Sequence, residues 1–200
     1  MIVRQIAVGT VANFVYLLVD ERTREGAVVD SGWETEPIAR AVEEAGATVR
    51  YAIATHEHFD HTSTLRDVAE KLSARVVAHE SSPIDCDMRV SDGQTLRLGE
   101  IRLRVLHTPG HTKDSISVYG GGSVFTGDTL FVGTIGRFER EDAPALYQSL
   151  YKVLLELPAS TTLYPGHDYG EVPARSLGEE RASNPYLMAG DLRSFLSLFS

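Results

Sequence analysis

The sequence predicts an α/β protein with two sheets, each covered on its outside by helices. In the first half, apolar strand-like segments alternate with segments whose apolar residues repeat at helical spacing. The middle of the chain alternates apolar and polar residues, as antiparallel hairpins do, before another helix and strand follow. The 200 residues suffice for a sizeable core, and no repeat or linker divides them, so we expect one domain over 1–200.

The first half is predicted to alternate strands with helices. Strands rich in Val, Leu and aromatic residues are expected at 13–20, 26–32, 49–55 and 75–80. A helix is expected over 37–45, because Pro37 suits a first turn and Gly46 suits a helix end. A second helix is indicated by the apolar repeat Leu65, Val68, Ala69 and Leu72.

The second half is predicted to contain two hairpins, a helix and one more strand. The stretch QTLRLGEIRLRVLHTPGHT favours one hairpin, and 115–128 favours another that turns at Gly120–Gly122. A loop over 133–142 leads to a helix that begins near Pro144, and a strand is expected at 161–167. The sequence ends with helical spacing of Leu192, Phe195, Leu196 and Phe199.

The composition argues against several classes of binding partner for this protein. The net charge is −9, with 28 acidic and 19 basic residues, which argues against nucleic-acid binding. No apolar run approaches the roughly 18 residues of a membrane span, and MIVRQIAVGT lacks the pattern of a signal peptide. The only cysteine, Cys86, cannot form an internal disulfide, so we expect a cytoplasmic protein with no membrane partner. A homodimer is compatible with the sequence.

The segment THEHFDH, residues 55–61, places His56, His58, Asp60 and His61 just after a predicted strand. Histidines can gather on a solvated turn, but strand ends and the loops beyond them commonly hold functional sites. Imidazole and carboxylate groups are good ligands for zinc, iron or manganese. The spacing therefore favours a metal site over a solvated turn.

Three more strand ends carry the same kinds of side chain. TPGHT places His111, FTGDT places Asp128 and YPGHDY places His167 after predicted strands, each beside a glycine that lets the backbone approach closely. Five of the seven histidines thus fall at three strand ends, together with two aspartates. Scattered surface residues would not arrange themselves in this way, and a shared metal centre is expected.

The motifs THEHFDH, TPGHT, FTGDTLF and YPGHDY, in this order, resemble those of the metallo-β-lactamase fold hydrolases over roughly 10–170. The resemblance implies a four-layer αββα sandwich with metals at one edge. GDTLFVGTIGRF is similar to the corresponding segment of glyoxalase II and the related persulfide dioxygenases. The tail GEERASNPYL resembles that of single-domain bacterial members of this branch.

The resemblance also implies a set of ligands for two divalent ions, with zinc favoured over iron or manganese. The first metal would be held by His56, His58 and His111, the second by Asp60, His61 and His167, with Asp128 bridging. Two ions about 3.5–4 Å apart lower the pKa of a water between them, and the resulting hydroxide is the expected nucleophile. Asp60 and Asp128 would take part in catalysis. His79 and His107 match no ligand position, and we expect both to be structural, with a supporting contact to a metal ligand as the alternative for His107.

Three further residues carry weaker signals. Asp30 ends a predicted strand, where it would support the metal loop or simply form a turn. Arg137 matches a basic residue that binds the glutathione portion of substrate in glyoxalase II; otherwise it would pair with Glu139 or Glu141. Tyr169 would donate a hydrogen bond to substrate or simply pack. Glu139 stands where glyoxalase II has a tyrosine, and an acid there would repel a carboxylate.

The leading functional hypothesis is a metal-dependent hydrolase acting on a thioester or related ester, with a hydroxyacyl-thiol substrate as in glyoxalase II. The alternative is a persulfide dioxygenase with one iron held by His56, His111 and Asp128, because two histidines and a carboxylate leave positions for oxygen and substrate. A nuclease of this fold is disfavoured by the short, acidic chain. A protein that only binds is disfavoured because all seven metal positions are filled.

Overall fold

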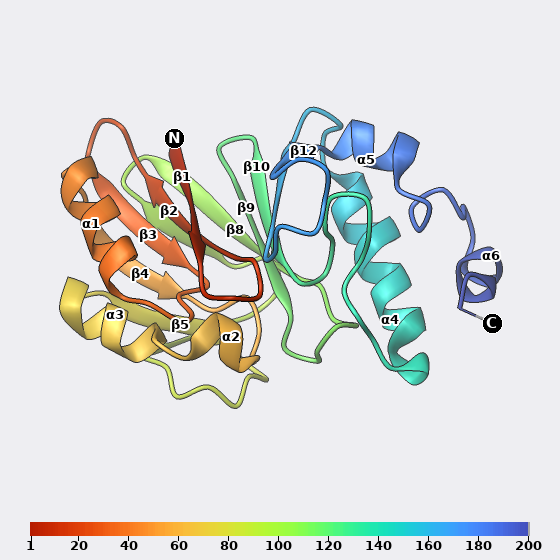
Figure 1. The fold of residues 1–200 in the computed structure, drawn as a ribbon, viewed down its shortest axis with the longest axis horizontal. Helices are drawn as coiled ribbons and strands as arrows, with labels where there is room; N and C mark the ends of the chain where they lie inside the picture. The colour runs from red at the N-terminus through yellow and green to blue at the C-terminus, as the bar shows by residue number, and fades with distance from the viewer. Residues whose placement is uncertain (200) are drawn as a thin grey trace.

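The computed structural model describes residues 1–199, which form two six-stranded sheets packed face to face (Figure 1). The first sheet contains β1 (Ile2–Val8), β2 (Asn13–Val19), β3 (Glu25–Val29), β4 (Thr48–Ile53), β5 (Arg75–His79) and β6 (Met88–Val90), in that order. Strands β1 to β3 pair antiparallel, whereas β3 to β6 pair parallel. The carboxyl ends of β3, β4 and β5 therefore lie at the same edge.

The second sheet is mostly antiparallel. It contains β7 (Thr95–Leu98), β8 (Ile101–His107), β9 (Ile116–Gly120), β10 (Ser123–Gly127), β11 (Thr162–Pro165) and β12 (Arg175–Ser176). Only β10 and β11 pair parallel. Their carboxyl ends therefore point the same way, as the loops of a shared site require.

Helices cover the outer face of each sheet. The bounds of the helices are α1 (Glu36–Ala45), α2 (Phe59–Thr62), α3 (Leu65–Leu72), α4 (Ala143–Gln148), α5 (Leu177–Ser183) and α6 (Leu192–Ser197). Helices α1 and α3 pack on the first sheet, and α4 and α5 on the second, with α6 against α4. The expected four-layer αββα sandwich is confirmed (Figure 1). No helix among residues 1–199 is long and apolar enough to cross a membrane.

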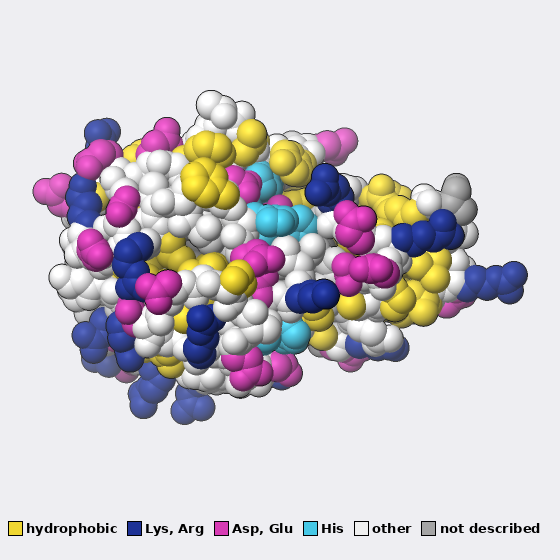
Figure 2. All heavy atoms as spheres, turned by 90° about the horizontal axis from the view of Figure 1, so that it is seen from below, with side chains coloured by type: hydrophobic (Ala, Val, Ile, Leu, Met, Phe, Trp, Pro, Cys, Tyr) yellow, Lys and Arg dark blue, Asp and Glu magenta, His cyan; other side chains and the backbone are white. Residues whose placement is uncertain are grey.

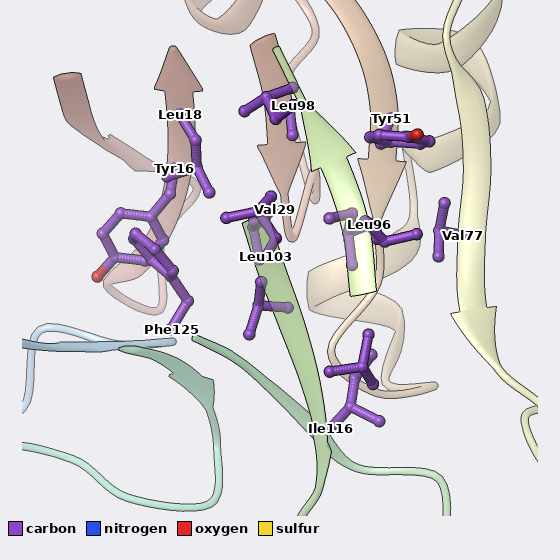
Figure 3. Close-up of a cluster of buried hydrophobic side chains, with 14 of the residues drawn as sticks. Tyr16, Leu18, Val29, Tyr51, Val77, Leu96, Leu98, Leu103, Ile116 and Phe125 are labelled. Atoms are coloured by element: carbon purple, nitrogen blue, oxygen red, sulfur yellow. The ribbon is translucent and has the colours of Figure 1, made fainter. Parts of the chain in front are cut away.

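The inner faces of the two sheets share one hydrophobic core (Figure 3). Tyr16 and Leu18 from β2 meet Leu103 from β8 and Phe125 from β10, and all four side chains are essentially inaccessible to water. The Tyr16 ring lies 5.1 Å from the Phe125 ring, in a tilted aromatic pair. Because this core joins the sheets, it also fixes the positions of the loops at their edges.

The predicted elements are present, with boundaries shifted by a few residues, but several elements are not foreseen. No strand is predicted before residue 13, yet β1 pairs with β2 in the register Ile2↔Val19. Strand β1 is an edge strand of mostly half-buried side chains, so it lacks the continuous apolar run of the central strands. The short β6 and β12 are missed as well. Helix α5 is also missed, although Ser176 and Glu179 form a capping box at its start.

One hydrogen bond joins the two sheets near the predicted metal site. The Tyr16 hydroxyl on β2 donates to the Pro165 carbonyl on β11 at 2.6 Å and accepts from Gln5 Nε2 at 3.0 Å. Both sheets thus converge just before the segment that carries His167.

We predict that Tyr16→Phe lowers the free energy of unfolding by about 1–3 kcal/mol, because the buried Pro165 carbonyl loses its donor. Urea denaturation measures the change. Tyr164→Phe is the matched control, since the Tyr164 hydroxyl makes no hydrogen bond within residues 1–199. Equal stability of the two variants would contradict a role for the Tyr16 hydroxyl.

Candidate metal centre

All seven predicted ligands gather at one edge of the sandwich, in loops that follow strands of both sheets. His56 and His58 follow β4, and Asp60 and His61 lie in the short helix α2. From the second sheet, His111 follows β8, Asp128 follows β10 and His167 follows β11. Figure 2 shows this edge, where histidine side chains surface between acidic groups.

Three histidines and Asp128 form the first group. His58 Nδ1 lies 3.1 Å from His56 Nε2 and 2.9 Å from His111 Nε2. The Asp128 Oδ2 atom lies 3.5 Å from His111 Nε2. Ligands placed tetrahedrally about 2.0–2.1 Å from an ion are about 3.3 Å apart. The convergent nitrogens therefore have the spacing that a divalent ion requires.

Asp60, His61 and His167 form the second group. His61 Nε2 and His167 Nε2 are 3.1 Å apart, and Asp60 Oδ2 lies 3.5 Å and 3.4 Å from them. The Asp128 carboxylate also reaches this group, with Oδ1 3.3 Å from His61 Nε2 and Oδ2 3.4 Å from His167 Nε2. Asp128 thus lies between the two groups.

The electrostatics of the centre suit a cation. Asp128 Oδ1 is buried and makes no aligned hydrogen bond among the described residues, a costly arrangement that a bound cation would relieve. Burial alone would raise the pKa of Asp128, but contacts with His167 and His61 hold it well below its usual value. Burial alone would lower the pKa of His61, whereas Asp128 and Asp30 raise it well above its usual value. The residues could therefore hold metal ions.

Hydrogen bonds at the outer ring nitrogens orient two of the histidines. His111 Nδ1 donates to the Arg137 carbonyl at 2.6 Å, and His167 Nδ1 donates to the Val11 carbonyl at 2.9 Å. Each bond leaves Nε2 unprotonated and directed into the centre, the tautomer that a metal ligand needs.

Asn13 and Trp33 support the second group and are not anticipated from the sequence. Asn13 Nδ2 donates to Asp60 Oδ2 at 3.0 Å, and Trp33 Nε1 donates to Asn13 Oδ1 at 2.7 Å. Asn13 starts an otherwise apolar buried strand, which is the one sequence signal that marks it as exceptional.

Asp30 lies directly beneath the centre, at the end of β3. Its carboxylate accepts hydrogen bonds from Thr55 N at 2.7 Å and Thr55 Oγ1 at 2.8 Å, and its Oδ2 lies 3.3 Å from His61 Nδ1. Asp30 also adopts a left-handed backbone with φ of 59°, which is strained for a residue other than glycine. It is therefore both a turn former and a neighbour of the candidate ligands.

Two glycines permit close approach of the ligand loops. A Cβ atom on Gly136 would lie 1.6 Å from the Asp128 carbonyl oxygen, and one on Gly32 would lie 1.8 Å from that of Asp60. Any side chain at either position would displace the loop that carries the facing aspartate.

The two predicted substrate-binding residues, Arg137 and Tyr169, differ in how they contact the candidate metal centre. The Arg137 side chain is exposed and, within the described chain, pairs with neither Glu139 nor Glu141. The Tyr169 ring is 54% exposed and stacks on His167, with ring centroids 4.7 Å apart and planes within 6°. Tyr169 thus flanks the centre, while Arg137 contacts it through its backbone.

The remaining two histidines belong to neither group of candidate ligands. The rings of His79 and His107 stack on each other, with centroids 4.1 Å apart. His79 Nδ1 bonds to Ser81 Oγ and His107 Nε2 to the Lys113 carbonyl.

We predict that Asp30→Asn weakens metal affinity by about 10–100-fold, because it disturbs the orientation of Thr55 and His61. Competition with a chelator measures this affinity. Asp20→Asn is the matched control, since Asp20 is also a buried aspartate directly after a strand, hydrogen-bonded by Arg22, Thr23 and Glu100. Equal loss of affinity in the two variants would show that Asp30 acts only through general stability.

Comparisons with known proteins agree with this geometry. The family model described as the metallo-beta-lactamase superfamily matches residues 8–167. A hydroxyacylglutathione hydrolase from Bradyrhizobium sp. is 40% identical over 162 residues, which cover 78% of this chain and 63% of that enzyme. The chain thus spans less than two thirds of the length of that relative.

Two proteins named ETHE1 are similar over more of the chain. The human mitochondrial persulfide dioxygenase ETHE1 is 32% identical over 195 residues, which cover 94% of this chain and 76% of that protein. The crystal structure of ETHE1 from Myxococcus xanthus superposes with a TM-score of 0.89 at 35% identity, covering 99% of this chain and 89% of that one. Because the family match spans all seven candidate ligands and the fold agrees, the chain belongs to the metallo-β-lactamase superfamily.

Proposed function

We propose that this protein is a hydrolase with two divalent metal ions, most simply zinc, that cleaves a hydroxyacyl thioester in the cytoplasm. One observation carries the proposal: the Asp128 carboxylate lies within 3.5 Å of ligand nitrogens from both groups. A carboxylate in that position can neutralise two ions at once. The similarity to a hydroxyacylglutathione hydrolase supports a thioester as the bond cleaved.

The proposed mechanism assigns distinct tasks to the two aspartates. Ions held by the seven ligands would polarise the thioester carbonyl and lower the pKa of a bound water to near neutrality. Asp128 is buried and keeps its charge, so it fixes the spacing of the two ligand groups. Asp60 Oδ2 receives a hydrogen bond from Asn13 and lies on the more exposed side, where it can accept a proton from the attacking water.

The chemistry needs no further acid. Attack on the acyl carbon breaks the C–S bond, and a thiolate, whose conjugate acid has a pKa of about 8.5, leaves without help. We propose that Arg137 attracts an acidic group of the substrate and that the exposed Tyr169 hydroxyl donates a hydrogen bond to it. No nucleic acid or membrane takes part in this scheme.

A second function is supported by the similarity to ETHE1 over nearly the whole chain. A single iron held by His56, His111 and Asp128 would suit an oxygen-dependent reaction of a persulfide. Asp128 Oδ2 is 3.5 Å from His111 Nε2, close enough for both to contact one ion.

Two assays on the same preparation separate these functions. Hydrolysis is followed as release of free thiol from S-lactoylglutathione and from simple acyl thioesters, and the second function as oxygen uptake with glutathione persulfide. Thiol release without oxygen uptake supports the hydrolase. Oxygen uptake without thiol release would overturn it in favour of the dioxygenase.

We predict that Asp128→Asn abolishes thioester hydrolysis by several orders of magnitude without unfolding the chain, because the shared negative charge is lost. The rate of thiol release and the circular dichroism spectrum report the two effects. His107→Gln is the control, since His107 stacks on His79 outside both ligand groups and should keep the activity. Near-normal hydrolysis by Asp128→Asn would contradict the bridging role.

A further inference from the structure

A pocket of about 470 Å³ lies between the loop that follows Asp128 and the C-terminal segment. Its walls are mostly apolar and come from Ile135, Phe138, Tyr186, Leu196 and Phe199. We call it the aromatic pocket. Its volume lies within the range of about 300–1,000 Å³ that is common for small-molecule sites.

The aromatic pocket shares part of its wall with the candidate metal centre. Gly136 lines the pocket, and its backbone lies against the Asp128 carbonyl and close to His111 Nδ1. The next residue, Arg137, also lines the pocket, and its carbonyl accepts the hydrogen bond from His111 at 2.6 Å. The pocket therefore borders the loop segment that orients His111, on the side of its outer ring nitrogen.

Aromatic contacts hold the walls in place before any ligand binds. Phe138 meets Phe199 edge to face with centroids 4.7 Å apart, and Tyr186 stacks on Phe199 at 5.5 Å. The fully buried Phe195 anchors α6 to Tyr147 of α4. Leu196 and Phe199 nevertheless remain 38% and 42% exposed, so apolar surface is available for a ligand to cover.

Two arginines line the pocket although the protein as a whole is acidic. Arg137 and Arg140 both line it, and neither guanidinium makes an ion pair among the described residues. Glu139 lies between them in sequence but is exposed and is not part of the lining. In a protein of net charge −9, two unpaired arginines at one apolar pocket favour an anionic ligand.

We propose that the aromatic pocket holds the non-reacting arm of the substrate, and that this arm is an aryl or branched alkyl group bearing an acidic group. This inference rests on the proposed thioester hydrolysis. Phe138, Leu196 and Phe199 offer no hydrogen bonds, so an amide group of the peptide arm of glutathione that lay against them would be buried without a partner. An apolar acid instead covers these side chains and directs its charge toward Arg137 and Arg140.

Binding of a non-reactive probe tests the proposal directly. Isothermal titration of the metal-loaded protein compares 4-phenylbutyrate with glutathione, and 4-phenylbutyrate is expected to bind more tightly. Leu196→Glu should weaken the binding of 4-phenylbutyrate about tenfold or more, because the new carboxylate in the pocket wall repels the carboxylate of the probe. Leu198→Glu is the matched control, since Leu198 is 47% exposed at the end of the same helix but does not line the pocket.

Arg140→Glu provides a second test that does not depend on the stability of α6. It should strongly weaken the binding of 4-phenylbutyrate, whose charge would face Arg140, but leave the binding of the neutral 4-phenylbutanamide unchanged. Tighter binding of glutathione than of 4-phenylbutyrate, or equal effects of Leu196→Glu and Leu198→Glu, would overturn the proposal.

Kinetics separate a failure of this proposal from a failure of the proposed hydrolysis. If glutathione thioesters are cleaved efficiently and Leu196→Glu leaves their KM unchanged, hydrolysis stands and the aromatic pocket is not the substrate site. If no thioester is cleaved but 4-phenylbutyrate binds and the variants change its affinity as expected, the pocket binds an apolar acid and the reaction assigned to the metals is wrong.

Discussion

The convergence of seven candidate metal ligands on one small region is the constraint on which the rest of the structure depends. Without a cation, the histidines around Asp128 balance its charge only in part, because its buried Oδ1 has no aligned donor among residues 1–199. The ligands come from loops of both sheets, so neither sheet alone can build the centre. The apolar core between the sheets therefore fixes the relative position of the loops that carry the candidate ligands.

Hydrogen bonds from neighbouring residues then orient the individual side chains of the candidate metal centre. Asp30, strained in a left-handed backbone, receives two hydrogen bonds from Thr55 and faces His61. Backbone carbonyls set the tautomers of His111 and His167. These contacts hold the candidate ligands in position through hydrogen bonds that do not involve a metal. The same loop that orients His111 also lines the aromatic pocket, so the candidate metal centre and the proposed substrate pocket share one segment.

The sequence could identify the residues that gather at the candidate metal centre, because each lies in a short motif directly after an apolar strand. Loops after strands commonly hold functional sites, and the resemblance to the family motifs indicates which of these residues belong to the same group. Strand β1 could not be predicted from its half-buried edge pattern. Asn13 and Trp33 act on Asp60 only because α2 lies beside the start of β2, which is a tertiary relation that no local pattern encodes. The aromatic pocket likewise depends on Phe199 meeting Phe138, some sixty residues earlier.

Anomalous diffraction at the zinc absorption edge shows whether Asp128 lies between two bound ions. Crystals grown with excess zinc should show two anomalous peaks about 3.5–4 Å apart, one at His56, His58 and His111 and the other at Asp60, His61 and His167. Asp128 should contact both. A single peak at saturating zinc, with the second group of candidate ligands turned away from it, would show that Asp128 does not bridge two ions.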